Sequence, residues 1–142
     1  MRNLLLGSFV LAAASPLAAQ SGWKEIGKTS SGNFVYVYPH SIKTVNGIIN
    51  ARVRVRFDPP VQTPQGPWAS SHSDAMFDCA KSTIAVKQTI YYADEKATRV
   101  VERKVNAKPG YGPALGGSMA KLALDYLCSQ GAGRRRGGPR SL

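Results

Sequence analysis

Histidine, cysteine and acidic residues are scarce in this sequence, and their scarcity limits the chemistry that the chain can perform. The 142 residues include two histidines, two cysteines and eight Asp and Glu. A metal site needs three or four converging ligands. The best candidates, His72, Asp74 and Asp78, would be spaced about 7 Å apart or more along one face of a strand. We therefore expect neither a metal nor another cofactor.

Long apolar runs are also missing, apart from one near the start of the chain. Residues Leu4–Ala14 are apolar or small, follow the positive charge of Arg2, and precede small residues that end at Ala19. The run is about half the roughly 20 residues that a membrane-spanning helix needs, and its flanks are those of a signal peptide. We predict cleavage after residue 19. With no cysteine at the cut, we expect an exported protein, periplasmic or extracellular, without a lipid anchor or a transmembrane segment.

Positive charge is abundant where acidic residues are few. There are 19 Lys and Arg, and the formal net charge is +11. Such a charge favours anionic partners, of which nucleic acid is a poor candidate outside the cytoplasm. Residues 131–142 consist mostly of Gly, Arg and Pro and bury too little apolar surface to order themselves. We predict a single domain over residues 20–130 and a disordered basic tail over 131–142.

The two cysteines, Cys79 and Cys128, form an even pair in a protein that is predicted to be exported. Such a pair is typical of a disulfide. The closed loop of about 50 residues would stabilise the fold by roughly 4 kcal/mol in the chain-entropy model. We therefore predict a Cys79–Cys128 bridge.

Alternating apolar and polar residues predict a β-rich domain. From Ala51 to Phe57, apolar residues alternate with Arg52, Arg54 and Arg56, which is typical of a strand with one face in water. Prolines in 58–67 predict a loop. Four apolar residues in the segment 83–92 are expected on one side of a strand: Ile84, Val86, Ile90 and Tyr92. The other predicted strands are Trp23–Ile26, Phe34–Tyr38, Trp68–Ala80 and Thr98–Val105.

A change of period near the end of the chain predicts a helix over Met119–Ser129, with Ser118 as its N-cap. Apolar residues there recur at helical spacing and include Cys128. Cys79 shares a strand face with Ala75 and Phe77. We therefore predict an α+β fold: a single antiparallel sheet of about six strands, with a C-terminal helix docked on one face by the disulfide.

The order of these segments resembles the surface-adhesin E-like family of Gram-negative bacteria. The residues that carry the resemblance are Trp23, Ile26-Gly27, Phe34–Ile42, Gly47, Arg56–Asp58, Asp78-Cys79 and Cys128. The resemblance implies a sheet with a docked helix and no catalytic activity. Its namesake is an adhesin that binds host matrix and serum proteins and can dimerise. Two departures are the missing lipidation cysteine and Tyr38, where many relatives carry an acidic residue.

The resemblance and the charge together predict a non-enzymatic binding module for host or envelope macromolecules. Arginine suits phosphate, sulfate and carboxylate because its planar fork donates two parallel hydrogen bonds. A solvated face that only keeps the protein soluble is the alternative for these arginines. The candidate contacts for an anionic ligand are Arg52, Arg54, Arg56, Arg134, Arg135 and Arg136.

Other functions are open from the residues alone. A structural or assembly accessory of the cell envelope needs no ligand at all. A small periplasmic hydrolase could use His72 with Asp74, but the sequence offers no nucleophile elbow to complete it. On the predicted helix, Leu122 and Tyr126 could form a dimer patch, or could belong to a wide buried stripe.

Overall fold

The computed structural model describes residues 22–136, with side chains up to residue 130. The predicted signal peptide, residues 1–19, lies outside the described residues and stays a prediction. The strands are β1 (Lys24–Lys28), β2 (Phe34–Val37), β3 (Lys43–Val45), β4 (Ile48–Thr63), β5 (Gly66–Asp78), β6 (Thr83–Tyr92), β7 (Val100–Val105) and β8 (Gly112–Pro113). The helices are η2 (Pro39–Ser41) and α1 (Met119–Arg136).

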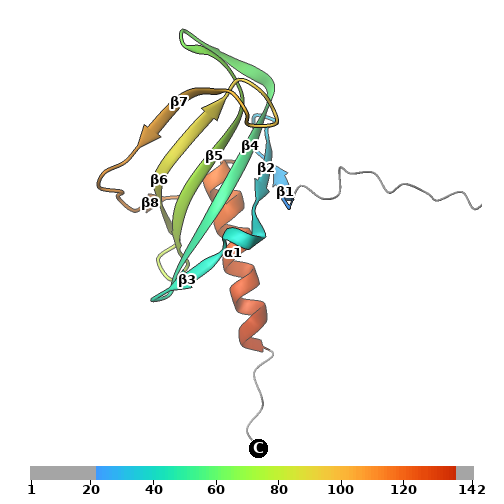
Figure 1. Ribbon diagram of the computed structural model, residues 1–142. Helices are drawn as coiled ribbons and strands as arrows, with labels where there is room; N and C mark the ends of the chain where they lie inside the picture. Colours follow the sequence, from blue (N-terminus) through green and yellow to red (C-terminus); the bar gives the residue numbers. More distant parts are fainter. Residues whose placement is uncertain (1–21, 137–142) are drawn as a thin grey trace, which may run out of the picture.

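The strands form one antiparallel sheet that curls into a half-barrel (Figure 1). Six of them follow one another in the order β1-β2-β4-β5-β6-β7, while β3 pairs with β4 and β8 pairs with β6. The helix α1 covers one face of the sheet and lies behind it in the view of Figure 1. The predicted α+β architecture is confirmed.

Alternation along the strands sorts the side chains onto two faces, as β geometry requires. On the face covered by α1, called the inner face, Ala51, Val53 and Val55 of β4 are buried together with neighbours from β2 and β5. Ala123, Leu124 and Leu127 of α1 complete this core. Burial of one such leucine is worth about 1.5–3 kcal/mol, so the packed stripe holds the helix on the sheet. The opposite face is called the outer face.

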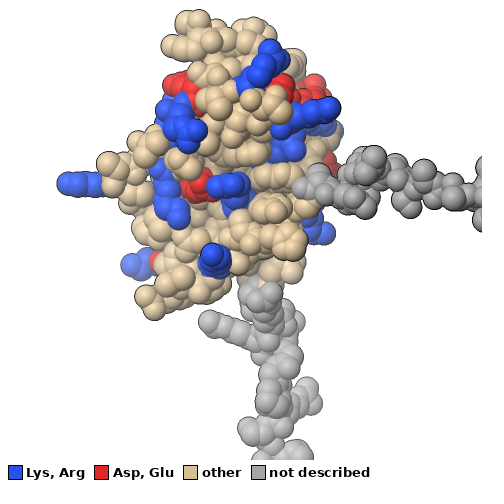
Figure 2. Space-filling model, viewed as in Figure 1, with Lys and Arg blue, Asp and Glu red and all other residues tan. Residues whose placement is uncertain are grey.

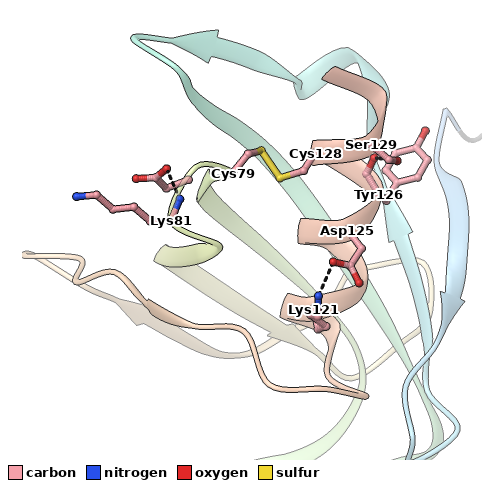
Figure 3. Close-up of a disulfide and its surroundings, with 8 residues drawn as sticks. Cys79, Lys81, Lys121, Asp125, Tyr126, Cys128 and Ser129 are labelled. Atoms are coloured by element: carbon pink, nitrogen blue, oxygen red, sulfur yellow. Dashed lines mark hydrogen bonds and ion pairs between the residues drawn. A yellow bond between two sulfur atoms is a disulfide. The ribbon is translucent and has the colours of Figure 1, made fainter. Parts of the chain in front are cut away.

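The helix begins at the predicted N-cap and is linked to the sheet by the predicted disulfide. The Ser118 hydroxyl accepts a hydrogen bond from the Lys121 N–H at 3.2 Å, which makes it the N-cap. Cys79, just after β5, is bonded to Cys128 of α1, with 5.6 Å between their Cα atoms (Figure 3). The bridge therefore ties the middle of the helix to the turn that follows β5.

The helix is longer than the predicted Met119–Ser129. It continues to Arg136, because backbone hydrogen bonds propagate through a segment without proline. The predicted disordered tail over 131–142 is therefore wrong for residues 131–136. Residues 137–142 lie outside the described part of the chain.

The predicted loop over 58–67 is wrong as well. Strand β4 continues to Thr63 and pairs with β5, in the register Val61–Trp68 and Thr63–Gly66. The prolines are tolerated for two reasons. The register shifts between Arg56 and Val61, and β2 pairs with β4 only as far as Arg56. Beyond that point β4 has a neighbour on one side only, so a missing N–H costs little.

The grouping of Ile84, Val86, Ile90 and Tyr92 on one side of β6 is also wrong. Val86 pairs with Ala75 but Gln88 pairs with Asp74, so Lys87 is an extra residue in a β-bulge. A one-residue slip exchanges the two faces of a strand. The first two apolar residues of the group therefore face α1, whereas the last two face outward.

Candidate functional site

The outer face of the sheet carries the three arginines of β4, as the alternation predicts. Arg52 pairs with Asp74 of β5, and Arg54 lies between Tyr36 of β2 and His72 of β5. Figure 2 views the molecule from this side, and Lys and Arg spread across it with fewer acidic side chains between them. The face is therefore basic and open to a partner.

Arg52 is held by a two-bond ion pair. Its Nε donates to Asp74 Oδ1 at 2.7 Å, and its Nη2 donates to Oδ2 at 3.2 Å. Gln88 Nε2 donates to the same Oδ2 at 2.7 Å. Burial alone would raise the pKa of Asp74, but the hydrogen bonds from Arg52 and Gln88 outweigh it, and the pKa lies below its ordinary value. The hydrogen bond to Asp74 in turn raises the pKa of Arg52.

Arg54 and Arg56 lie against aromatic rings. The guanidinium carbon of Arg54 is 5.6 Å from the ring centroid of Tyr36, and that of Arg56 is 4.1 Å from Phe34. Arg54 also donates from Nη2 to the Glu95 carbonyl, and Arg56 Nη1 lies 3.7 Å from the Glu95 carboxylate. Such stacking is favourable by about 0.5–2 kcal/mol per pair and restricts the arginine rotamers.

His72 sits inside the aromatic cluster of this face. Its ring centroid is 4.9 Å from that of Trp23 and 5.0 Å from that of Tyr92, and Trp23 also packs against Tyr38. Burial, followed by the charges of Arg54 and Arg52, lowers the pKa of His72 to about 4. The imidazole is therefore neutral at pH 7.

The groups proposed for hydrolysis are occupied by other contacts. Asp74 accepts hydrogen bonds from Arg52 and Gln88, and a base with the pKa of His72 would be weak. The Ser41 hydroxyl donates to the Tyr38 carbonyl and accepts from the Arg52 N–H. In the described part of the chain, no three His, Cys, Asp or Glu side chains gather as metal ligands.

The other residues singled out in the sequence belong to α1. Leu122 and Tyr126 of α1 are half-buried and pack against the core, and Leu122 approaches Gly27 of β1. They serve the wide buried stripe, and a dimer stays a prediction. Arg134, Arg135 and Arg136 belong to the end of α1, and their side chains lie outside the described residues.

The sequence reasoning missed two lysines. Lys87 points outward from the bulge of β6, and its Nζ donates to Asn50 Oδ1 of β4 at 3.2 Å. Lys43 of β3 is exposed beside the same part of β4. The only sequence signal was the break in the alternation of 83–92 near Lys87, which did not by itself indicate a bulge.

The chain is similar to one known protein family. The family model described as surface-adhesin protein E matches residues 23–129, which is most of the chain. This chain belongs to the surface-adhesin protein E family. No curated protein matches it. Among residues 22–136, no helix is both long enough and apolar enough to cross a membrane.

Solved structures of Haemophilus influenzae protein E share the fold of this adhesin-family chain. One is 18% identical, with a TM-score of 0.55, and the match covers 82% of this chain and 91% of that one. A second crystal form is 16% identical, with a TM-score of 0.56 and coverage of 85% and 98%. The protein from non-typeable Haemophilus influenzae is 17% identical, with a TM-score of 0.56 and 84% coverage of both chains.

Proposed function

We propose that this adhesin-family protein is an exported, non-enzymatic binding module that holds an anionic macromolecule of the envelope or of a host. The observation that carries the proposal is the outer face of the sheet. One face is covered by α1, and the other presents Arg52, Arg54 and Arg56 side by side with aromatic rings. A basic face with half-buried rings beside its arginines suits carboxylate, sulfate or phosphate groups on a large partner.

Rigidity of the arginines supports this function. Arg52 is fixed by Asp74, and Arg54 and Arg56 are fixed by ring stacking. A partner that binds fixed side chains has less conformational entropy to remove than one that binds free side chains. Arg52 uses Nε and Nη2 in its ion pair, which leaves the N–H groups of its other nitrogen for a ligand.

The predicted export completes the proposal. After removal of residues 1–19 the domain would reside in the periplasm or outside the cell. Acidic glycans and anionic lipids are abundant on the surfaces that it would meet there. Arg134, Arg135 and Arg136 add a second positive segment near the C-terminus. In this proposal they contribute by charge alone.

The test is the salt dependence of binding by the full exported protein. We expect retention on an immobilised sulfated polysaccharide at 50 mM salt and its loss at 500 mM, because the Debye length falls well below 10 Å. A neutral polysaccharide of the same length is the control. Replacement of Arg134, Arg135 and Arg136 by Gln should reduce the salt dependence without abolishing binding. Failure to bind sulfated polysaccharide, anionic lipid vesicles and host matrix proteins alike at low salt would refute the function.

A structural accessory of the envelope is the alternative, and cross-linking in intact cells separates the two. The binding module should be cross-linked to a glycan, a lipid or a host protein through residues of the outer face. Cross-links of this chain to itself alone would contradict the proposal.

A further inference from the structure

Two open hollows cross the outer face and meet at one pair of residues. The first has a volume of about 480 Å³ and lies between β6 and the chain that follows β7, with Val105 and Asn106 among its walls. The second, of about 470 Å³, lies over β4 beside η2 and β3. Both are lined by Asp74 and Lys87. We call the two hollows together the Asp74–Lys87 trough.

The trough carries unbalanced positive charge. Its walls include Lys43, Arg52 and Lys87, and Asp74 is the one acidic residue among them. The carboxylate of Asp74 is already matched by Arg52. The Lys87 ammonium donates to the neutral amide oxygen of Asn50 at 3.2 Å. Two lysine charges are therefore available to an anion.

The backbone aims Lys87 into the trough. The bulge of β6 places Lys87 on the outer face, and the chain after β7 holds that bulge in place. Asn106 donates its backbone N–H to the Lys87 carbonyl at 2.9 Å and its side-chain amide to the Val86 carbonyl at 2.7 Å. The bulge therefore places two consecutive residues, Lys87 and Gln88, on the outer face, which regular alternation would not do.

The shape of the trough and its uncharged lining residues favour a chain of sugars over a small ion as the ligand. The trough is open and runs across several strands, whereas a small-molecule site encloses most of its ligand. Asn50, Gln88 and Asn106 supply neutral side-chain amides for hydroxyls, and Tyr38 lines one hollow. Hydroxyls, an apolar ring face and regularly placed negative charges occur together in acidic polysaccharides.

We propose that the Asp74–Lys87 trough binds an acidic polysaccharide, with Lys43 and Lys87 contacting successive carboxylate or sulfate groups. Asn50 and Asn106 would contact hydroxyls between these groups, and Arg52 would be positioned by Asp74 at the centre. The inference rests on the proposed function, because it names the site on the outer face and the chemistry of the anionic partner.

The experiment compares two double variants of the full exported protein by calorimetric titration with a sulfated, uronic-acid-containing octasaccharide. Lys43→Gln with Lys87→Gln removes two charges from the trough. Lys81→Gln with Lys96→Gln removes two exposed charges elsewhere and is the matched control. We expect Kd to rise at least tenfold for the trough pair and less than threefold for the control pair. Circular dichroism and thermal melting confirm that both remain folded.

Three outcomes would overturn the inference. Equal losses in the two double variants would mean attraction by overall charge, which leaves the proposed function standing. Equal binding of free sulfate or of monomeric glucuronate would mean a simple anion site. Binding of anionic vesicles without binding of the octasaccharide would assign a lipid partner instead. Absence of binding to every anionic probe would refute the proposed function itself.

Discussion

Asn106, which follows β7, is hydrogen-bonded to the bulge at Lys87 in β6. Its backbone N–H donates to the Lys87 carbonyl at 2.9 Å, and its side-chain amide donates to the Val86 carbonyl at 2.7 Å. The carbonyls of two successive bulge residues thus receive donors from one residue beyond the end of β7. Through these two hydrogen bonds, the chain after β7 orients Lys87 on the outer face.

Replacement of Asn106 by Ala should loosen the bulge. The side-chain bond to the Val86 carbonyl is lost and the backbone bond stays, so we expect a loss of about 1 kcal/mol in the free energy of unfolding. Urea denaturation measures the change. Gln62→Ala, an exposed replacement in β4, is the control. Affinity for the octasaccharide should also fall, and unchanged affinity would show that Asn106 does not position Lys87.

The disulfide should account for a large part of the stability of this small domain. The bridge links two residues that are 49 positions apart and joins the middle of α1 to the turn after β5. Replacement of both Cys79 and Cys128 by Ser avoids a lone thiol and should lower the free energy of unfolding by about 2–4 kcal/mol. Denaturation of the unmodified protein with a reducing agent should give the same loss. A smaller change than 1 kcal/mol in both would mean that the core alone holds the helix.

Gly27 is the point where β1 lies against α1. Its φ is +151°, in a region that only glycine adopts readily, and a Cβ would lie 3.2 Å from Leu122 Cδ2. Gly27→Ala should therefore lower the free energy of unfolding through both backbone strain and crowding, by about 2–4 kcal/mol.

Gly47 in the turn between β3 and β4 is the control for strain alone. Its φ is +79° and a Cβ would meet no atom within 4 Å. We expect Gly47→Ala to cost about 1 kcal/mol. Equal costs at Gly27 and Gly47 would contradict close packing of the helix on β1.

Local patterns predicted the parts of the fold that depend on local chemistry. The alternation around Arg54 predicted which side chains face outward, and the helical spacing around Cys128 predicted the docked helix. Ser118 was found as the cap because capping depends only on the first turn. These predictions needed no knowledge of distant residues.

Other parts of the fold and of the site depend on distant partners. The bulge at Lys87 is held by Asn106, and the prolines of β4 are tolerated because β2 has ended. The trough exists only once β3, β4 and β6 lie side by side. For that reason the sequence predicted a ladder of arginines and missed Lys43 and Lys87.

The neutral imidazole of His72 should make stability depend on pH in a defined window. Its pKa is lowered to about 4, first by burial and then by Arg54 and Arg52, while Asp74 opposes the shift. In the unfolded chain a histidine has its ordinary pKa near 6.5. Between about pH 4 and pH 6.5, His72 is protonated in the unfolded chain but neutral in the folded protein. Stability should therefore be complete above about pH 6.5 and fall as the pH decreases toward 4.

His72→Phe keeps a ring between Trp23 and Tyr92 and cannot titrate. Urea unfolding at several pH values from 7.5 to 4 should give a constant free energy offset above pH 6.5 and a growing advantage for the variant below it. The lowered pKa values of Asp74 and of Asp94, the latter to about 2, act below pH 3.8 and leave this window clear. His40→Gln controls for removal of an exposed imidazole. Parallel curves for the His72 variant and the unmodified protein would mean that His72 takes up its proton equally in both states.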